Sequence, residues 1–372
     1  MPEHIPFLRV GATYTELQAD LDAAVQRVLH SGWYLLGNEL KAFEADYARF
    51  TESQHCVGVA NGLEALILAL KAVGVQPGQE VIVPANTYIA TWLAVSYIGA
   101  TPVPVEPVPG RWNLDPERLE AALTSKTAAV LPVHLYGQPA DLDPILGWAR
   151  AHGLKVVEDA AQAHGAKYKG RRIGAHADAV AWSFYPGTNL GCFGDGGAVT
   201  TDDAEVADRI QVLRNYGSRQ KYLNEVKGHN SRLDEVQAAV LSVKLHHLDA
   251  WNARRKALAC RYLEGLEGIP GLGLPTLEPQ TEHAWHLFVV DHPDREELQA
   301  HLATQGIQTL VHYPIPPHLS EAYADDQPWG AFPITEAAAQ HHLSLPIGPH
   351  LSLAEVDRVV SVISDWCVNS RP

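Results

Sequence analysis

Residues 182–201 read Trp182-Ser-Phe-Tyr-Pro-Gly-Thr188-Asn-Leu-Gly-Cys-Phe-Gly-Asp-Gly-Gly197-Ala-Val-Thr-Thr201. The apolar, β-prone run 179–184 predicts a buried strand, and residues 198–200 predict a second, short strand. The turn between them is rich in glycine, which lets a backbone adopt positive φ angles and approach a ligand closely. This stretch therefore predicts a strand that ends in a ligand-binding turn.

Strand and helix patterns alternate along most of the chain. Apolar runs predict strands at 56–60, 80–84, 101–105, 127–134 and 155–159, and helical periodicity appears at 15–31, 39–50, 65–73, 89–98 and 144–152. Such alternation predicts a largely parallel sheet covered by helices on both faces. The sequence is therefore of the α/β class.

The chain changes character after a long helix predicted at 245–266. Shorter strands are expected beyond it at 286–290 and 310–314, with helices at 295–305 and 352–368. We expect a large α/β domain over 1–245 and a small C-terminal α+β domain over 246–372.

Composition excludes several classes of protein. The formal net charge of −15 argues against a nucleic-acid or anionic-membrane partner. The four cysteines are widely spaced, and the nineteen histidines form no HExxH motif, so neither disulfides nor a metal site is predicted. The N-terminus lacks the features of a signal peptide, and no apolar run reaches the length of a membrane span. We expect a soluble, cytoplasmic protein.

Polar and aromatic residues follow several predicted strands. The turn at Gly62 and Leu63 leads from a strand into a helix, a geometry that binds anions through free N–H groups. Tyr88 follows the next strand and could stack on a flat ring, although a core tyrosine is the alternative. Asp159 ends a buried strand and needs a partner there, unless it caps a helix. Together these positions predict a ligand site at one edge of the sheet.

The segment Ser183-Phe-Tyr-Pro-Gly-Thr-Asn-Leu-Gly resembles the cofactor segment of the DegT/DnrJ/StrS sugar aminotransferases. The segments that begin at Tyr88 and His134 look most like the members that aminate C3 of a nucleotide-linked 3-keto-6-deoxyhexose. The resemblance extends over nearly the whole chain. It implies an aspartate-aminotransferase-like large domain, which is pyridoxal-phosphate (PLP) fold type I.

The resemblance also implies roles for individual residues. Asp159 would face the pyridinium nitrogen of PLP, Tyr88 would stack on its ring, and Gln162 would lie beside the ring hydroxyl. Gly62, Leu63 and Ser183 would hold the phosphate, together with Asn230 from a second protomer of a homodimer. The substrate side would be formed by Tyr34, Tyr185, Arg232, His312, Tyr313 and His318.

The implied reaction transfers an amino group from L-glutamate, through PLP, to a keto sugar that is carried by a nucleotide, dTDP by resemblance. In this family the residue after Pro-Gly is the lysine that forms a Schiff base with PLP and then moves a proton. Here that residue is Thr188. Threonine forms no stable Schiff base and is too weak a base at neutral pH.

Three explanations of Thr188 remain open. The chain is an aminotransferase whose lysine has been replaced, so that PLP is held noncovalently, as an external aldimine or in the pyridoxamine form. Alternatively, it is a natural relative that binds nucleotide sugar or PLP as a regulator. The third is a PLP-dependent sugar dehydratase that uses another base, for which His164 or His312 is the candidate. We favour the first explanation because the rest of the motif is intact.

Overall fold

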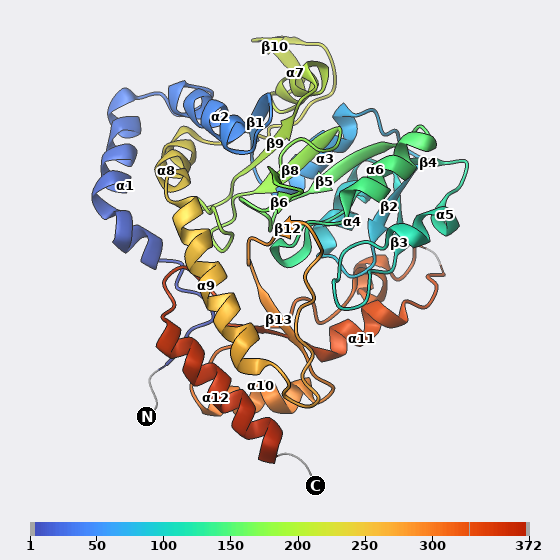
Figure 1. The fold of residues 1–372 in the computed structure, drawn as a ribbon. Helices are drawn as coiled ribbons and strands as arrows, with labels where there is room; N and C mark the ends of the chain where they lie inside the picture. Colours follow the sequence, from blue (N-terminus) through green and yellow to red (C-terminus); the bar gives the residue numbers. More distant parts are fainter. Residues whose placement is uncertain (1–3, 327, 370–372) are drawn as a thin grey trace.

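The computed structural model describes residues 4–326 and 328–369. A seven-stranded sheet with the order β1-β9-β8-β5-β4-β2-β3 forms its centre (Figure 1). The strands are β1 (His55–Val59), β2 (Glu80–Pro84), β3 (Thr101–Val105), β4 (Thr127–Val130), β5 (Lys155–Asp159), β8 (Ala179–Ser183) and β9 (Gly197–Thr201). Only β9 runs opposite to the others within this sheet. The predicted, largely parallel sheet is confirmed.

Helices cover both faces of the sheet, because alternate side chains of each strand point to opposite sides. Val81 and Val83 face a core that includes helices α3 (Gly62–Ala72), α4 (Ile89–Tyr97) and α7 (Ala204–Leu213). Ile82 faces the other core, which includes α2 (Asn38–Phe50), α6 (Leu142–Ala151) and α8 (Glu235–Leu245). Helix α1 (Ala12–Ser31) packs outside α8.

A third core lies in the C-terminal part of the chain. It is built from α9 (Leu248–Leu266), β13 (Phe288–Asp291), α10 (Arg295–Thr304), β14 (His342–Leu345) and α12 (Leu353–Asn369). Figure 1 shows α9 running from the neighbourhood of α8 to the side of α12. Ile5 is also buried in this core, so the chain's first described residues pack with its last. The domain boundary at 245/246 stays a prediction.

Two buried carboxylates fix helices that lie far away in sequence. Glu235 accepts hydrogen bonds from the backbone N–H groups of Gly37, Glu39 and Leu40 at the start of α2 (2.6–3.2 Å). Glu106 does the same at the start of α11 (Pro333–His341). Both carboxylates satisfy N–H groups that a helix start leaves free and complement its dipole.

The minor strands are β6 (Lys167–Tyr168), β7 (Arg171–Arg172), β10 (Ser218–Gln220), β11 (Leu223–Asn224) and β12 (Thr281–Glu282), and α5 is the short helix Leu119–Ala122. Several predicted elements differ from the structure. The strand expected at 127–134 ends at Val130. The helix expected at 245–266 begins at Leu248, after α8 has ended at Leu245. The strand expected at 310–314 is reduced to a single bridge between Leu310 and Ser344.

Cys56, Cys192 and Cys367 are buried, whereas Cys260 is exposed. Within residues 4–326 and 328–369, no helix is long and apolar enough to cross a membrane. The same residues contain no group of three or more His, Cys, Asp or Glu side chains suited to a metal ion.

Candidate active site

The predicted site residues of the large sheet lie at its carboxyl-terminal edge. Asp159 and Ser183 are the last residues of β5 and β8, and Gly62 and Tyr88 follow β1 and β2 by a few residues. These four strands run in the same direction, so their ends meet at one edge. Open α/β sheets bind ligands at this edge.

The turn between β1 and α3 lies directly against Ser183. A Cβ atom placed on Gly62 would come within 2.6 Å of the Cβ atom of Ser183, so only glycine fits. Asn61 caps α3, because its side chain accepts a hydrogen bond from the N–H of Glu64 at 2.9 Å. The start of α3 therefore lies beside a serine hydroxyl, an arrangement suited to a phosphate group.

Asp159 is buried at 6% exposure and is oriented by neutral donors. Its Oδ2 accepts a hydrogen bond from Thr91 Oγ1 (2.9 Å), and its Oδ1 accepts one from the N–H of Ala161 (3.2 Å). Thr87 lies behind Thr91, with 2.9 Å between the two hydroxyls. Burial raises the pKa of Asp159, and the donors from Ala161 and Thr91 oppose that rise. A cationic group facing Asp159 would relieve the cost of burying its charge.

Two tyrosines and a glutamine border the same space. The rings of Tyr88 and Tyr313 are 5.1 Å apart, and Tyr88 is 53% exposed. Gln162 donates a hydrogen bond to the hydroxyl of Tyr313 (2.9 Å) and accepts one from the N–H of Tyr136 (2.6 Å). The structure thus joins three residues predicted for the site, Tyr88, Gln162 and Tyr313, across the sheet and the C-terminal part.

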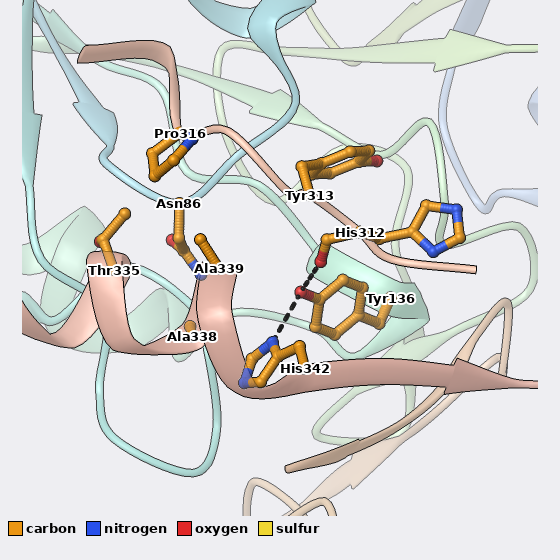
Figure 2. Close-up of a pocket in the computed structure, with 9 residues that line it drawn as sticks. All are labelled: Asn86, Tyr136, His312, Tyr313, Pro316, Thr335, Ala338, Ala339 and His342. Atoms are coloured by element: carbon orange, nitrogen blue, oxygen red, sulfur yellow. Dashed lines mark hydrogen bonds between the residues drawn. The ribbon is translucent and has the colours of Figure 1, made fainter. Parts of the chain in front are cut away.

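Tyr136 lies in the wall between the two parts of the molecule. Figure 2 shows its hydroxyl between the backbone of His312 and the ring of His342, beside a small pocket that Tyr313 also lines. The hydroxyl donates to the carbonyl oxygen of His312 at 2.6 Å and lies 3.3 Å from Nδ1 of His342. These bonds hold the segment that carries Tyr313 against the large sheet.

The carboxylate next to Asp159 in sequence has a different environment. Glu158 is fully buried on the other face of β5, where it lies 2.8 Å from Nε2 of His134. Because Nδ1 of His134 accepts the N–H of Ala140, its Nε2 carries the proton and donates to Glu158. The N–H of Ala177 donates to the second oxygen of Glu158. Glu158 is therefore closed off by protein groups.

Thr188 is turned into its own loop. Its Oγ1 lies 2.8 Å from the carbonyl oxygen of Tyr185 and 2.9 Å from that of Leu190, and it can donate its single proton to either. The N–H of Thr188 also donates to the carbonyl of Tyr185. The hydroxyl thus stabilises the turn in the way that Ser and Thr side chains commonly do.

Helix α8 and the domain junction hold this loop from behind. Lys244 donates to the carbonyl of Gly191 (2.7 Å) with its amine 4.3 Å from the ring centre of Phe193. Gln237 forms two hydrogen bonds with the backbone of Phe193. Asn189 donates to the carbonyl of Ala284 and to Asn252 of α9. The loop is thereby fixed on both sides of Thr188.

The remaining predicted residues occupy several environments. Tyr34 and Tyr185 are exposed at 51% and 61%, and Asn230 is also exposed. Arg232 donates to Asn215 at 3.2 Å and lies over the ring of Tyr216. None of these described contacts joins them to Asp159, so their roles stay predictions.

Three histidines were predicted as substrate residues or as bases. His318 is buried against the start of α11, where it contacts Glu336 and Phe332 rather than Tyr313. His164 is completely buried beside Trp182, and burial lowers its pKa to about 3. His312 lies 2.8 Å from Ser344, and burial lowers its pKa to about 4. His164 and His312 are therefore neutral, weak bases at pH 7.

Sequence reasoning did not identify Thr91, Thr87 or Tyr136. Thr91 lies three residues after Tyr88, in the first turn of α4, so it faces the same edge of the sheet. That spacing was a usable signal for Thr91. Tyr136 gave no such signal, because its partners His312 and His342 are distant in sequence.

The residues present are suited to PLP. The exposed ring of Tyr88, the buried carboxylate of Asp159 and the Gly62–Ser183 turn would meet the ring, its nitrogen and the phosphate respectively. The buried carboxylate is the most specific of these features, since neutral donors alone leave its pKa raised.

Comparison with known proteins agrees with this geometry. Residues 15–364 match the DegT/DnrJ/EryC1/StrS aminotransferase family. The dTDP-3-amino-3,4,6-trideoxy-alpha-D-glucose transaminase of Streptomyces venezuelae is 59% identical over 97% of this chain and 96% of its own. The erythromycin biosynthesis sensory transduction protein EryC1 of Saccharopolyspora erythraea is 57% identical over 96% of this chain and 98% of its own.

Solved structures show the same fold. S. venezuelae DesV in complex with a ketimine intermediate superposes with a TM-score of 0.97, at 58% identity and full coverage of both chains. NtdA of Bacillus subtilis with bound cofactor PMP gives a TM-score of 0.93, at 32% identity over 98% of this chain and 86% of its own. The chain has the fold of type I aminotransferases and belongs to the DegT/DnrJ/EryC1/StrS family of PLP-dependent sugar aminotransferases.

Proposed function

We propose that this chain binds PLP or its pyridoxamine form without a covalent bond and recognises a dTDP-linked 3-keto-6-deoxyhexose and L-glutamate. The similarity to the S. venezuelae transaminase supports the sugar class, because identity is high over nearly both full lengths. The observation that carries the proposal is Asp159, a buried carboxylate that Thr91 orients beside Tyr88 and Tyr313.

When bound, the cofactor acts as an electron sink for the carbon that gains or loses the amino group. Asp159 would hold a proton on the pyridine nitrogen, and Tyr88 would cover one face of the ring. The start of α3 and Ser183 would bind the phosphate. Tyr313 and Gln162 would close the site on the side of the C-terminal part, which excludes water.

Thr188 would remove the two tasks of a lysine at this position, covalent attachment and proton transfer. The Thr188 hydroxyl donates to backbone carbonyls of its own loop. The neighbouring groups do not replace the base, because burial raises the pKa of Tyr313 and lowers that of His312 to about 4. We therefore propose that transamination is impaired in this chain.

We also propose a homodimer in which Asn230 reaches the cofactor phosphate of the second protomer. Its exposed position supports this role. Asn230 lies between His229 and Ser231, both of which contact the chain's own α3 region. The Arg232 side chain would accompany Asn230 across the interface.

The test compares the chain with Thr188→Lys and with Thr188→Met, which has similar length but no amine. Each protein is incubated with PLP and reduced with borohydride, and its intact mass is then measured by mass spectrometry. We expect covalent PLP only in Thr188→Lys, and we expect glutamate-dependent amination of a dTDP-3-keto-6-deoxyhexose to rise at least about 100-fold in that variant alone.

Other outcomes would contradict parts of the proposal. Equal amination in all three proteins would show that Thr188 causes no impairment. Binding of the nucleotide sugar without amination in any variant would favour a regulator. Glutamate-dependent loss of a sugar hydroxyl in the original chain would favour a dehydratase. Absence of PLP binding in every variant would overturn the cofactor assignment.

A further inference from the structure

The segment 229–231 is fastened to the rest of the chain by its backbone. The N–H of His229 donates to the carbonyl of Leu213, and the carbonyl of His229 accepts the N–H of Tyr216, both at 2.7 Å. The N–H of Ser231 donates to the carbonyl of Arg214. The segment is therefore extended, with an antiparallel bridge at Asn230.

Side chains of an extended segment alternate between two faces. Ser231 Oγ accepts the N–H of Ala60 (3.2 Å), just before the turn at Gly62. His229 contacts α3, the helix that begins at that turn. Asn230 therefore points to the opposite face, while Ser231 contacts the residue before the Gly62 turn region and His229 contacts the side of α3.

The contacts of His229 define its tautomer. Its Nε2 lies 2.7 Å from the amine of Lys71, which can only donate. Its Nδ1 therefore carries the proton and faces Oε2 of Glu64 at 3.4 Å. That oxygen is buried and has no hydrogen-bond partner of normal length in the described structure. Lys71, His229 and Glu64 thus form a chain of complementary groups on one side of α3.

We propose that His229 is a positioning residue: held by Lys71 and Glu64, it fixes the segment that presents Asn230 against the helix whose start binds the cofactor phosphate. The inference rests on the proposed function. It adds that, within one protomer, the turn that binds its own cofactor phosphate is connected through α3 and His229 to the Asn230 that reaches the partner's phosphate. Loosening His229 then weakens phosphate binding without removing any group that touches the cofactor.

The electrostatics of this chain favour a neutral His229. Burial and the nearby Lys71 lower the pKa of His229, and Glu64 opposes them. A neutral ring is required, because a protonated one would present a second donor to the Lys71 amine. The contact therefore persists at neutral pH.

The test uses the whole chain and two ligands, pyridoxamine 5′-phosphate and pyridoxamine, whose difference is the phosphate. His229→Phe keeps the ring volume but removes both ring nitrogens. His229→Gln restores an acceptor for Lys71. We expect His229→Phe to weaken binding of the phosphorylated ligand about tenfold and that of pyridoxamine less than twofold, with His229→Gln recovering most of the loss.

The outcomes separate this inference from the proposed function. If the original chain shows no preference for the phosphorylated ligand, the cofactor assignment fails. If it has the preference and His229→Phe keeps it unchanged, only the positioning role fails. Equal weakening for both ligands, or no recovery in His229→Gln, would show a general structural effect and would also overturn the role.

Discussion

The two ends of the candidate site are built in different ways. At one end, where the cofactor ring would lie and which we call the ring end, Asp159 is oriented by Thr91. There Gln162 also links Tyr313 to Tyr136. These hydrogen bonds connect the carboxyl-terminal edge of the sheet with the C-terminal part of the chain. At the loop end, the hydroxyl of Thr188 is directed back to the carbonyl groups of its own turn. The first end joins groups from distant parts of the chain, whereas the second satisfies its hydroxyl within its own turn.

This difference shows that the fold and the chemistry depend on separate residues. The loop around Thr188 is held by Lys244, Gln237 and Asn189, none of which needs a lysine at position 188. A substitution at position 188 alone can therefore change the chemistry of the site while the surrounding loop keeps its structure. The ring end has no such independence, because its donors and acceptors come from the sheet and from the C-terminal part together.

The largest effect is expected from the two adjacent carboxylates of β5. In a Thr188→Lys background, Asp159→Asn should slow the reaction with glutamate about 100- to 1000-fold, because the charge facing the ring is removed. Glu158→Gln is the matched control, since it makes the same change on the face sealed by His134. Stopped-flow absorbance of the glutamate reaction measures both.

Glu158→Gln should lower stability while leaving the rate within about threefold, because Glu158 contacts only protein groups. Similar rate losses in the two variants would show that Asp159 has no special place at the ring. A rate loss confined to Glu158→Gln would reverse the assignment of the two faces.

A smaller effect is expected at Thr91. Thr91→Val removes the hydrogen bond to Asp159 but keeps the shape, so the pKa of Asp159, already raised by burial, should rise further. As the solution is acidified, Asp159 then becomes protonated, and loses its charge, at a higher pH. Binding of pyridoxamine 5′-phosphate should weaken about tenfold. The acid limb of its pH profile, where affinity falls as the pH is lowered, should move to higher pH.

Thr87→Val is the control for Thr91, because Thr87 contacts the Thr91 hydroxyl and not the carboxylate. We expect it to shift the acid limb less. Titration calorimetry from acidic to neutral pH would reveal the limb. An unchanged limb in Thr91→Val would mean that Thr91 does not set the ionisation of Asp159.

Local patterns in the sequence were sufficient for most of the sheet. The bounds predicted for β2, β3 and β5 agree with the structure. The start predicted for α9 was three residues early because Leu245, the last residue of α8, and Leu248 are both buried, so the apolar pattern continues across the break. The strand expected at 310–314 did not form because Tyr136 takes the carbonyl of His312 and Pro314 lacks an N–H group.

The candidate site was predictable where it follows strand ends and not where it depends on distant partners. Asp159, Ser183 and Gly62 lie at the ends of recognisable elements, so their proximity could be expected. The approach of Tyr313 to Gln162 depends on how the C-terminal part packs on the sheet, which no local pattern reports. The same holds for the tautomer of His134, which Ala140 determines.

The smallest expected effect concerns the support of the Thr188 loop. Burial lowers the pKa of Lys244 to about 8, below its value of about 10.5 in the unfolded chain. Between these values the unfolded chain binds more protons, so Lys244 makes the folded state more stable as pH rises through this window. Lys244→Met should reduce the pH slope of the unfolding free energy above pH 8 by about 1 kcal/mol per pH unit.

Lys155→Met is the matched control, because Lys155 lies half-exposed and pairs with Asp178 at the surface. Urea unfolding at pH 8, 9 and 9.5 gives the slope for each protein, and the control should retain that of the original chain. If Lys244→Met also retains it, the amine stays charged in the fold, and its contacts with Gly191 and Phe193 then compensate fully for burial. In that case each end would contain a buried charge, Lys244 at the loop end and Asp159 at the ring end. The contrast between the two ends would then be limited to Thr188 itself.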